Sequence, residues 1–371
     1  MRGSLREIAR RTGLSTSSVS LALRGLGRLS EGTRARVRAV ADEMGYQQNP
    51  LLSRALSLVR QPEGTRYRET FAFILEYATE TGPDYQKELH AGAEQRAASL
   101  ACKLESFELS GKPSEHRRWS RIFKARGIRG LILFPRLESR QPRFSMEWDS
   151  FVAVEIGRTL WSPRNLHRVE GAEFHNLMET MHLLKRVGYK RIGMAVEPGQ
   201  DRHQRGICYS AFLMAQQRMP AVQRIPILAL EGPWNRTHFK AWMKKYKPDI
   251  LLVHDVEPVC AWLEEMKMKI PRDVSLFNIN VRRYDRPGPH QEYKWSGLRR
   301  DHAGIGRRAV EMVSNLLMND EWGLAGNPSC WQVDDFWIPG ETLARPIGEH
   351  ISPEGFLMLR APVSVRHYRG G

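Results

Sequence analysis

The amino-terminal fold is decided by the stretch Thr12-Gly13-Leu14-Ser15-Thr16-Ser17-Ser18-Val19-Ser20-Leu21-Ala22-Leu23-Arg24. Gly13 suits a tight turn, because glycine adopts left-handed backbone angles without strain. Ser15 predicts the start of a short helix, since its hydroxyl can accept hydrogen bonds from the free amides of the first turn. Apolar residues recur at helical spacing and form one stripe, at Val19, Ala22 and Leu23. The opposite side is small and partly polar, and it consists of Thr16, Ser17, Ser20, Leu21 and Arg24.

Two further helices flank this stretch. Ser4 and Glu7 form a capping-box pattern, which predicts a helix from Leu5 onward. A third helix is predicted to start near Ser30 and to end at Gly45. Three short helices, the first two joined by a glycine turn, favour a helix-turn-helix unit. The plainer alternative is a three-helix cap on a larger domain.

The charge distribution favours the DNA-binding interpretation. The chain has 371 residues and a formal net charge of +16. Residues 1–62 contain 11 Arg, no Lys and 4 acidic residues, a net +7, while the other 309 residues carry +9. The charge density of the small unit is therefore about four times that of the remainder, which indicates a polyanionic partner such as nucleic acid.

The order of these residues resembles the DNA-binding headpiece of the LacI/GalR repressors. The match runs from Leu5 through Gly13-Leu14-Ser15, Leu29-Ser30 and Glu43-Met44-Gly45-Tyr46 to Asn49. The resemblance implies that residues 15–24 enter the major groove of double-stranded DNA and that Ser30, Thr33 and Arg34 contact phosphates. Family members often have a base-reading Arg where this chain has Leu21, so an apolar contact to a thymine methyl is expected there instead.

Residues 49–60 form the next segment. Pro50 suits a first helical turn, and residues 51–60 are good helix formers, but ten residues are too few for a stable isolated helix. The resemblance implies a hinge helix that pairs with its dimer mate and inserts a leucine into the minor groove. That position holds Ala55 here, and Leu56 is the expected wedge; a plain linker helix is the alternative. The predicted DNA-binding residues are Ser4, Ser15, Thr16, Ser17, Ser20, Leu21, Arg24, Ser30, Thr33, Arg34, Asn49, Leu52, Ala55 and Leu56.

Beyond a polar boundary at residues 61–66, strand-length apolar runs alternate with helical stretches. The predicted strands are 71–77, 130–134, 151–156, 191–196, 225–230, 250–254 and 274–279. The predicted helices lie near 84–101, 115–126, 172–187, 204–217, 236–246, 256–268 and 302–318. This alternation predicts an α/β fold of parallel sheets with helices on both faces, in one sheet or two.

The resemblance favours two sheets, as in a two-lobed periplasmic-binding-protein-like core. The motifs are Val187-Gly188-Tyr189-Lys190-Arg191, Ile270-Pro271-Arg272-Asp273-Val274-Ser275 and Asp301 with Gly304-Ile305-Gly306. The expected domains are a helix-turn-helix headpiece (1–48), a hinge helix and linker (49–68), a two-lobed effector-binding and dimerisation core (69–346) and a C-terminal tail (347–371).

The resemblance also implies a small-molecule effector between the lobes. In the family, an Arg and an Asp form hydrogen bonds to this small molecule. The Arg position corresponds to Arg205 here, and the Asp position corresponds to Asn280, at a strand end that faces the cleft. The family's acidic turn reads Ile156-Gly157-Arg158 here. These changes predict an anionic or weakly polar effector, possible classes being a sugar or an anionic sugar derivative; a core without ligand binding is the rival. Tyr77, Tyr85 and Phe134 are candidates for stacking on a ring, or for lobe core.

Several classes of protein are disfavoured by the sequence. No hydrolase, metalloprotease or P-loop motif is present, so neither an enzyme activity nor a metal or cofactor is expected. Gly304-Ile305-Gly306 is interpreted as helix packing, and Asp334-Asp335 as one exposed and one tethered acid. His175 and His182 are interpreted as structural. The four separated cysteines predict buried thiols in a reducing compartment, and no run suits a membrane span, which favours a cytoplasmic protein.

The resulting hypothesis is a sequence-specific transcriptional regulator, and more specifically a repressor that binds a palindromic operator as a homodimer. Three alternatives stay open at this stage. They are a regulator whose core has lost effector binding, a sugar-binding protein or enzyme, and a general architectural DNA binder.

Overall fold

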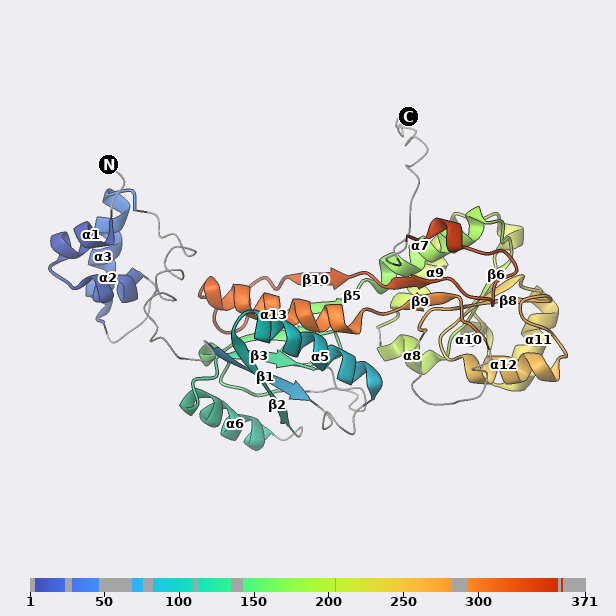
Figure 1. The fold of residues 1–371 in the computed structure, drawn as a ribbon, viewed down its shortest axis with the longest axis horizontal. Helices are drawn as coiled ribbons and strands as arrows, with labels where there is room; N and C mark the ends of the chain where they lie inside the picture. Colours follow the sequence, from blue (N-terminus) through green and yellow to red (C-terminus); the bar gives the residue numbers. More distant parts are fainter. Residues whose placement is uncertain are drawn as a thin grey trace, which may run out of the picture.

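The computed structural model of the protein describes residues 4–23, 29–46, 69–75, 83–109, 113–134, 143–203, 205–281, 293–352 and 355. Among these residues, a small helical unit precedes a core with two β-sheets (Figure 1). The expected fold class is therefore confirmed. The division of the chain at residues 48, 68 and 346 stays a prediction.

The helical unit contains α1 (Leu5–Thr12), α2 (Thr16–Leu23) and α3 (Glu31–Glu43). Gly13 ends α1 in the left-handed region, at φ +70°, as the turn requires. Ser4 caps α1 through the amide of Glu7, at 3.3 Å, but the Glu7 carboxylate expected to reach back pairs with Arg10. The three helices share a small apolar core of Ile8, Ala9, Val19, Ala22, Val37 and Ala41.

Lobe 1 is the six-stranded sheet with the helices that cover it. Its strands lie in the order β10-β5-β4-β3-β1-β2, and every neighbouring pair is parallel. The strands are β1 (Glu69–Leu75), β2 (Cys102–Glu108), β3 (Gly130–Leu133), β4 (Val152–Ile156), β5 (His167–Gly171) and β10 (Cys330–Val333). The helices are α5 (Asp84–Ser99), α6 (Pro113–Ala125), η1 (Trp148–Ser150) and α13 (His302–Met318).

Side chains of β1 point alternately to the two faces of the sheet, and each face of the sheet has its own hydrophobic core. Phe71 and Phe73 face α5 and α13, while Ala72 and Ile74 face α6. The α5–α13 contact is close because glycines lie in it: a Cβ on Gly306 would come within 2.0 Å of the Leu89 carbonyl oxygen. Gly92 similarly abuts Ala303. The interpretation of Gly304-Ile305-Gly306 as a helix-packing motif is confirmed.

Lobe 2 is the five-stranded sheet, in the order β11-β9-β8-β7-β6, with only β11 antiparallel. Its strands are β6 (Ile192–Ala195), β7 (Ile250–Val253), β8 (Ser275–Asn278), β9 (Gly297–Arg299) and β11 (Phe336–Ile338). Its helices are α7 (Glu173–Arg186), α8 (Pro198–His203), α9 (Ile207–Gln217), η2 (Ala221–Gln223), α10 (Leu228–Glu231), α11 (Arg236–Tyr246), α12 (Val256–Glu265) and η3 (Gly348–His350).

The chain passes between the lobes three times. It leaves lobe 1 between β5 and α7, returns between β9 and α13, and leaves again between β10 and β11 (Figure 1). Each lobe is thus built from segments that are distant in the sequence.

Several expectations need correction. The predicted strand 225–230 is a loop followed by α10, since Pro226 has no amide to donate, and Ile225 and Ile227 are buried without joining a sheet. Five strands were missed: β2, β5, β9, β10 and β11. Of the four cysteines expected to be buried, Cys330 is exposed. His175 and His182 lie on the exposed side of α7.

Candidate functional site

The first candidate site is the outward face of α2. Val19 and Ala22 are fully buried against α1 and α3, whereas Thr16 and Ser17 are exposed, and Ser20 and Leu21 are half-buried. Ser15 precedes the helix, and its hydroxyl accepts a hydrogen bond from the Ser18 amide at 3.1 Å. Short hydroxyl side chains can reach base edges in a major groove, and the methyl groups of Leu21 can contact a thymine methyl.

The amino end of α3 holds the residues expected to contact phosphates. Ser30 caps this helix by accepting from the Thr33 amide at 3.2 Å, and the two hydroxyls lie 2.8 Å apart. Arg34 follows on the first turn and is half-buried. Free amides and hydroxyls at a helix amino end form a suitable anion site. Outside the described residues lie Arg24, Asn49, Leu52, Ala55, Leu56 and Tyr77.

The second candidate site lies at the strand ends of lobe 2 that face lobe 1. Asn280, two residues after β8, is joined to His254 Nε2 by a hydrogen bond of 3.1 Å. His254 Nδ1 lies 3.3 Å from Asp255, whose other oxygen accepts from Gln200 at 3.2 Å. Four polar side chains therefore form a continuous chain across the carboxyl ends of β6, β7 and β8, which is where open α/β sheets bind ligands.

Arg205 connects the two lobes. It lies before α9 with a left-handed backbone, at φ +56°, and its exposed guanidinium donates to the Leu160 carbonyl of lobe 1 at 3.2 Å. The amide of Leu160 in turn donates to Glu155 at 2.8 Å. Burial raises the pKa of Glu155 to about 7, although this amide, Arg168 and Arg205 favour its ionised form.

Arg158 follows β4, as expected, but its charge is already matched by a protein group. Its Nε donates to Glu170 of β5 at 2.8 Å, and Gln332 donates to the same carboxylate at 3.2 Å. Burial opposes the ionisation of Glu170, but these hydrogen bonds outweigh it and lower its pKa. Arg158 is therefore held against the sheet of lobe 1.

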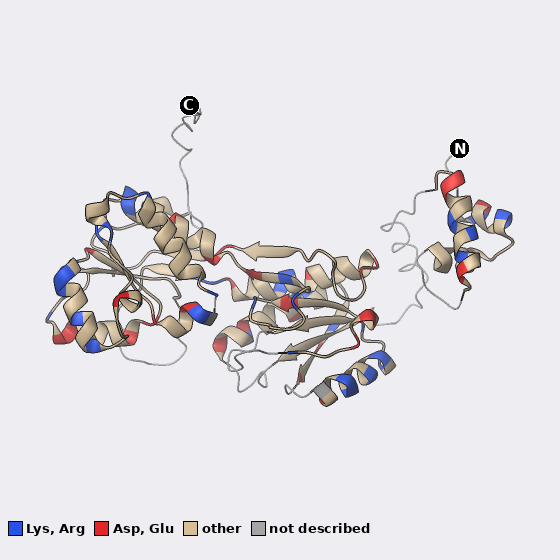
Figure 2. Ribbon diagram, turned by 180° about the vertical axis from the view of Figure 1, so that it is seen from behind, with Lys and Arg blue, Asp and Glu red and all other residues tan. Residues whose placement is uncertain are grey.

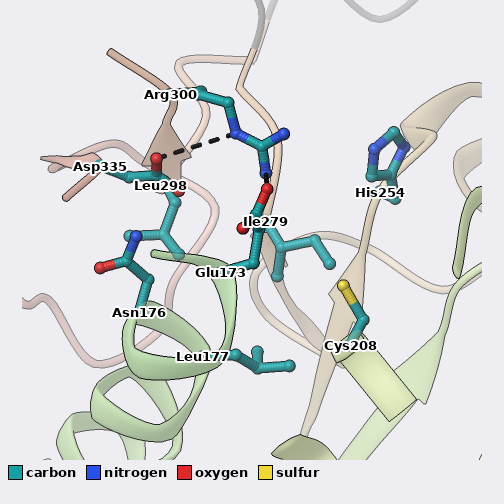
Figure 3. A pocket seen from close by; sticks show the side chains of 9 residues that line it. All are labelled: Glu173, Asn176, Leu177, Cys208, His254, Ile279, Leu298, Arg300 and Asp335. Atoms are coloured by element: carbon teal, nitrogen blue, oxygen red, sulfur yellow. Dashed lines mark ion pairs between the residues drawn. The ribbon is translucent and has the colours of Figure 1, made fainter. Parts of the chain in front are cut away.

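A small cavity of about 20 Å³ lies where the three crossing segments meet (Figure 3). Each segment contributes one charged side chain: Glu173 from the first, Arg300 from the second and Asp335 from the third. Arg300 Nη2 lies 2.9 Å from Glu173, and its Nε lies 3.9 Å from Asp335. A cavity of this size holds about one water molecule.

Asp335 is the carboxyl group of this cluster whose ionised form is disfavoured by burial. Its side chain is buried, whereas Asp334 is exposed, which confirms the expected pair of one exposed and one tethered acid. Burial raises the pKa of Asp335 to about 6, because the 3.9 Å contact with Arg300 compensates only partly for lost hydration.

The two aromatic candidates that the structure describes lie together on lobe 1. Phe134, just after β3, is 3% exposed, and Tyr85 of α5 stacks on it with ring centroids 6.0 Å apart. The other side of Tyr85 approaches His302, at 5.7 Å. Tyr85 is half-exposed, so it is the member of the pair with surface left for a ligand.

Sequence reasoning missed most of the polar residues at these sites. His254 is the last residue of a predicted strand and Asp255 lies between it and a predicted helix, and this position was the signal available. Gln200 lies in α8, a helix that was not predicted. Glu173 and Arg300 had no comparable signal, because their proximity depends on which segments cross between the lobes. No group of three metal-binding side chains and no helix suited to cross a membrane occurs among the described residues.

Comparison with known proteins agrees with this architecture. Residues 4–49 match the family model of bacterial regulatory proteins of the lacI family, and residues 181–325 match that of a periplasmic binding protein-like domain. No curated protein matches the chain significantly.

Solved structures give a fold-level likeness. A LacI-family regulator from Rhizobium etli is 14% identical over 74% of this chain and 99% of its own, with a TM-score of 0.53. A LacI-family protein from Silicibacter pomeroyi is 19% identical over 92% of this chain and 100% of its own, with a TM-score of 0.47. The lac repressor dimer bound to operator and the anti-inducer ONPF is 15% identical, over 93% and 100%, with a TM-score of 0.48. The chain therefore joins a helix-turn-helix unit of the lacI family of bacterial regulatory proteins to a two-lobed core of the periplasmic binding protein-like type.

Proposed function

We propose that the protein is a repressor that binds a palindromic operator as a homodimer, with the outward face of α2 in the major groove. The observation that carries this proposal is the division of α2 into a buried face and an exposed polar face, within an amino-terminal segment of 62 residues that carries a net charge of +7. Two copies related by a two-fold axis would place the α2 helices on the two half-sites.

The test is selection of bound DNA from a random pool with the full chain, followed by measurements with three variants. Ser17→Ala and Leu21→Ala are expected to change the preferred bases, because both face outward from α2. Arg34→Ala is expected to weaken binding to all sequences alike and to lower the salt slope by about 1, as loss of one phosphate contact does. If all three variants lose affinity uniformly, or if no sequence is preferred, the protein is an architectural binder instead.

We further propose that a small molecule binds between the lobes and alters operator affinity. In support, Arg205 reaches from lobe 2 to the Leu160 carbonyl of lobe 1, and Tyr85 of lobe 1 lies beside His302. The Asn280 to Gln200 chain supplies both donors and acceptors. An anionic sugar derivative suits Arg205, because its guanidinium contacts a neutral carbonyl and forms no ion pair with a described residue. Binding would change the angle between the lobes and so couple the two sites.

A thermal-shift comparison of neutral sugars, sugar acids and sugar phosphates tests this part. An anionic ligand is expected to stabilise the wild type by about 2.7 kcal/mol at a hundred times its Kd. Arg205→Ala should abolish that stabilisation, and Arg186→Ala, which removes an exposed cation from α7, should preserve it. Stabilisation by neutral sugars alone would contradict the charge argument.

A second candidate is a regulator whose core binds no effector. The observation in its favour is that Arg158 and Arg205 already contact protein oxygens, of Glu170 and Leu160. Under this alternative, none of the three ligand classes would raise the melting temperature.

A further inference from the structure

The positive charge of the core is concentrated in one short segment. Residues 110–129 contain seven Lys or Arg and one Glu, a net +6, whereas the whole of residues 63–371 carries +9. Twenty residues therefore account for two thirds of the net charge outside the amino-terminal 62 residues. The helix-turn-helix unit does not explain this charge, because the segment lies in lobe 1.

Most of this segment is α6, which has one buried face and one basic face. His116, Ser120 and Phe123 are buried against the sheet. Arg117, Arg118 and Arg121 are exposed on the opposite side, at spacings that place them together. Figure 2 shows Lys and Arg following one another along α6. We call Arg117, Arg118 and Arg121 the α6 arginine face.

The cations at the end of the segment differ from this face, because acidic residues neutralise them. Lys124 pairs with Glu147, Arg126 with Glu105 and Arg129 with Glu69. The three arginines of the α6 arginine face form no ion pair with any residue that the structure describes. Their charge is available to a partner.

The position of α6 relates this face to the path of the chain from the helix-turn-helix unit. The carboxyl end of α6 leads into β3, and Gly130 of β3 pairs with Phe71 of β1. Arg129 also pairs with Glu69, the first residue of β1. Arg121 lies about 6 Å along the helix axis from the end of α6 at Ala125, and Arg117 about 12 Å. The face therefore lies beside the point where the chain enters the core.

We propose that the α6 arginine face binds the phosphate backbone of duplex DNA that flanks the site held by the helix-turn-helix unit. This inference rests on the proposed DNA-binding function. Arg117 and Arg121 are about 6 Å apart along the helix, and phosphates of one strand rise by about 3.4 Å each, so the face spans two or three phosphates.

The chemistry of the face favours DNA over an acidic protein partner. None of the exposed large apolar side chains of the described residues lies on α6. A protein interface needs a desolvated centre of aromatic or apolar anchors, whereas phosphate contacts need only accessible charge and hydrogen-bond donors. An exposed basic face without such anchors therefore fits a polyphosphate backbone.

The test compares wild type with the triple variant Arg117→Ala, Arg118→Ala, Arg121→Ala on two duplexes. One contains only the selected operator, and the other adds 20 base pairs of random sequence on each side. The variant should match wild type on the short duplex and bind the long duplex more weakly. Its salt slope on the long duplex should be shallower by about 2 to 3 units, so the wild-type advantage grows roughly 30-fold between 200 and 50 mM salt.

Two matched variants separate specific contacts from a general charge effect. The triple variant Arg186→Ala, Lys190→Ala, Lys244→Ala removes three exposed cations from lobe 2 and should behave as wild type on both duplexes. Replacing the α6 arginines by lysines should restore most of the affinity, because lysine also binds phosphate, as a point charge. Thermal melts of all variants establish that the fold is retained.

Equal affinities and salt slopes of wild type and the α6 alanine variant on the long duplex would overturn the proposal. An equal loss in the lobe 2 variant would also overturn it, because the effect would then reflect net charge. If no operator emerges from the selection, the proposed function fails but this inference is still tested. The α6 variant must then bind a long random duplex more weakly than wild type, since phosphate contacts carry no sequence information.

Discussion

The hydration that the Asp335 carboxylate loses on burial is only partly replaced by protein contacts. It faces Arg300 at 3.9 Å, with Glu173, Asn176 and Asp334 as its other polar neighbours, and burial raises its pKa to about 6. In the unfolded chain the pKa is near 3.9. Between these values the folded protein binds a proton that the unfolded chain does not. Folding is therefore favoured at low pH, and this contribution is lost as the pH rises through 6.

Asp335→Asn should remove this pH dependence. The free energy of unfolding of wild type, relative to the variant, should fall by about 1.4 kcal/mol per pH unit between roughly pH 4 and 6 and be level above that. Urea unfolding of both proteins at pH 5, 6 and 7 measures the difference. Glu155, with a pKa of about 7, affects both proteins equally and cancels. Parallel stability curves would show that Asp335 titrates normally.

The same aspartate shows what sequence reveals at this scale. That Asp334 and Asp335 point to opposite sides followed from the two-residue period of extended backbone. The partners of Asp335 did not follow, because Arg300 and Glu173 lie in other crossing segments, 35 and 162 positions earlier in the chain. Contacts between distant segments leave no local pattern. The division of α2 into a buried side with Val19 and Ala22 and an outward side with Thr16 and Ser17 did follow, because these residues are neighbours in one helix.

At the scale of elements, the contact between α5 and α13 depends on glycine. Gly306→Ala adds a Cβ 2.0 Å from a backbone carbonyl, which neither helix can avoid without moving. We expect a loss of about 1 to 3 kcal/mol in the free energy of unfolding, despite the better helix propensity of alanine. Gly32→Ala in α3 is the control: nothing lies within 4 Å of that Cβ, so it should stabilise by about 0.5 to 1 kcal/mol. Chemical unfolding of both variants provides the measurement, and a stable Gly306→Ala protein would contradict the close packing.

The elements that were predicted well from the sequence are helices with a regular apolar stripe and strands made of consecutive apolar residues. Helix α13 was expected near 302–318, the range observed, and Asp301 caps its amino end by accepting from the Gly304 amide. Strands β2, β10 and β11 lie at sheet edges. Strand β2 was missed because polar side chains are tolerated there, and β10 and β11 because they have only four and three residues. The apolar run at 225–230 was wrongly predicted to be a strand, because buried loops and buried strands have similar amino-acid composition.

At the scale of the molecule, periodicity predicted an α/β core but not the number of sheets. The alternation of strands and helices is the same for one large sheet and for two smaller ones, and only the resemblance to a known family favoured two. Arg158 and Asn280 were expected after strands and Arg205 at the start of a helix, and they follow β4 and β8 and precede α9. Their present partners, Glu170, Leu160 and His254, were not, because they depend on how the lobes are joined.

The three crossings also determine the order in which the molecule can be completed during synthesis. The first five strands of lobe 1 emerge from the ribosome before any of lobe 2, but α13 and β10, which cover and extend that sheet, are made more than 120 residues later. Until then the apolar surface around Phe71 and Phe73 has only α5 to shield it. A chain that stops anywhere between residues 172 and 301 therefore carries a complete helix-turn-helix unit beside an uncovered sheet, and such surfaces are prone to aggregate or to need a chaperone.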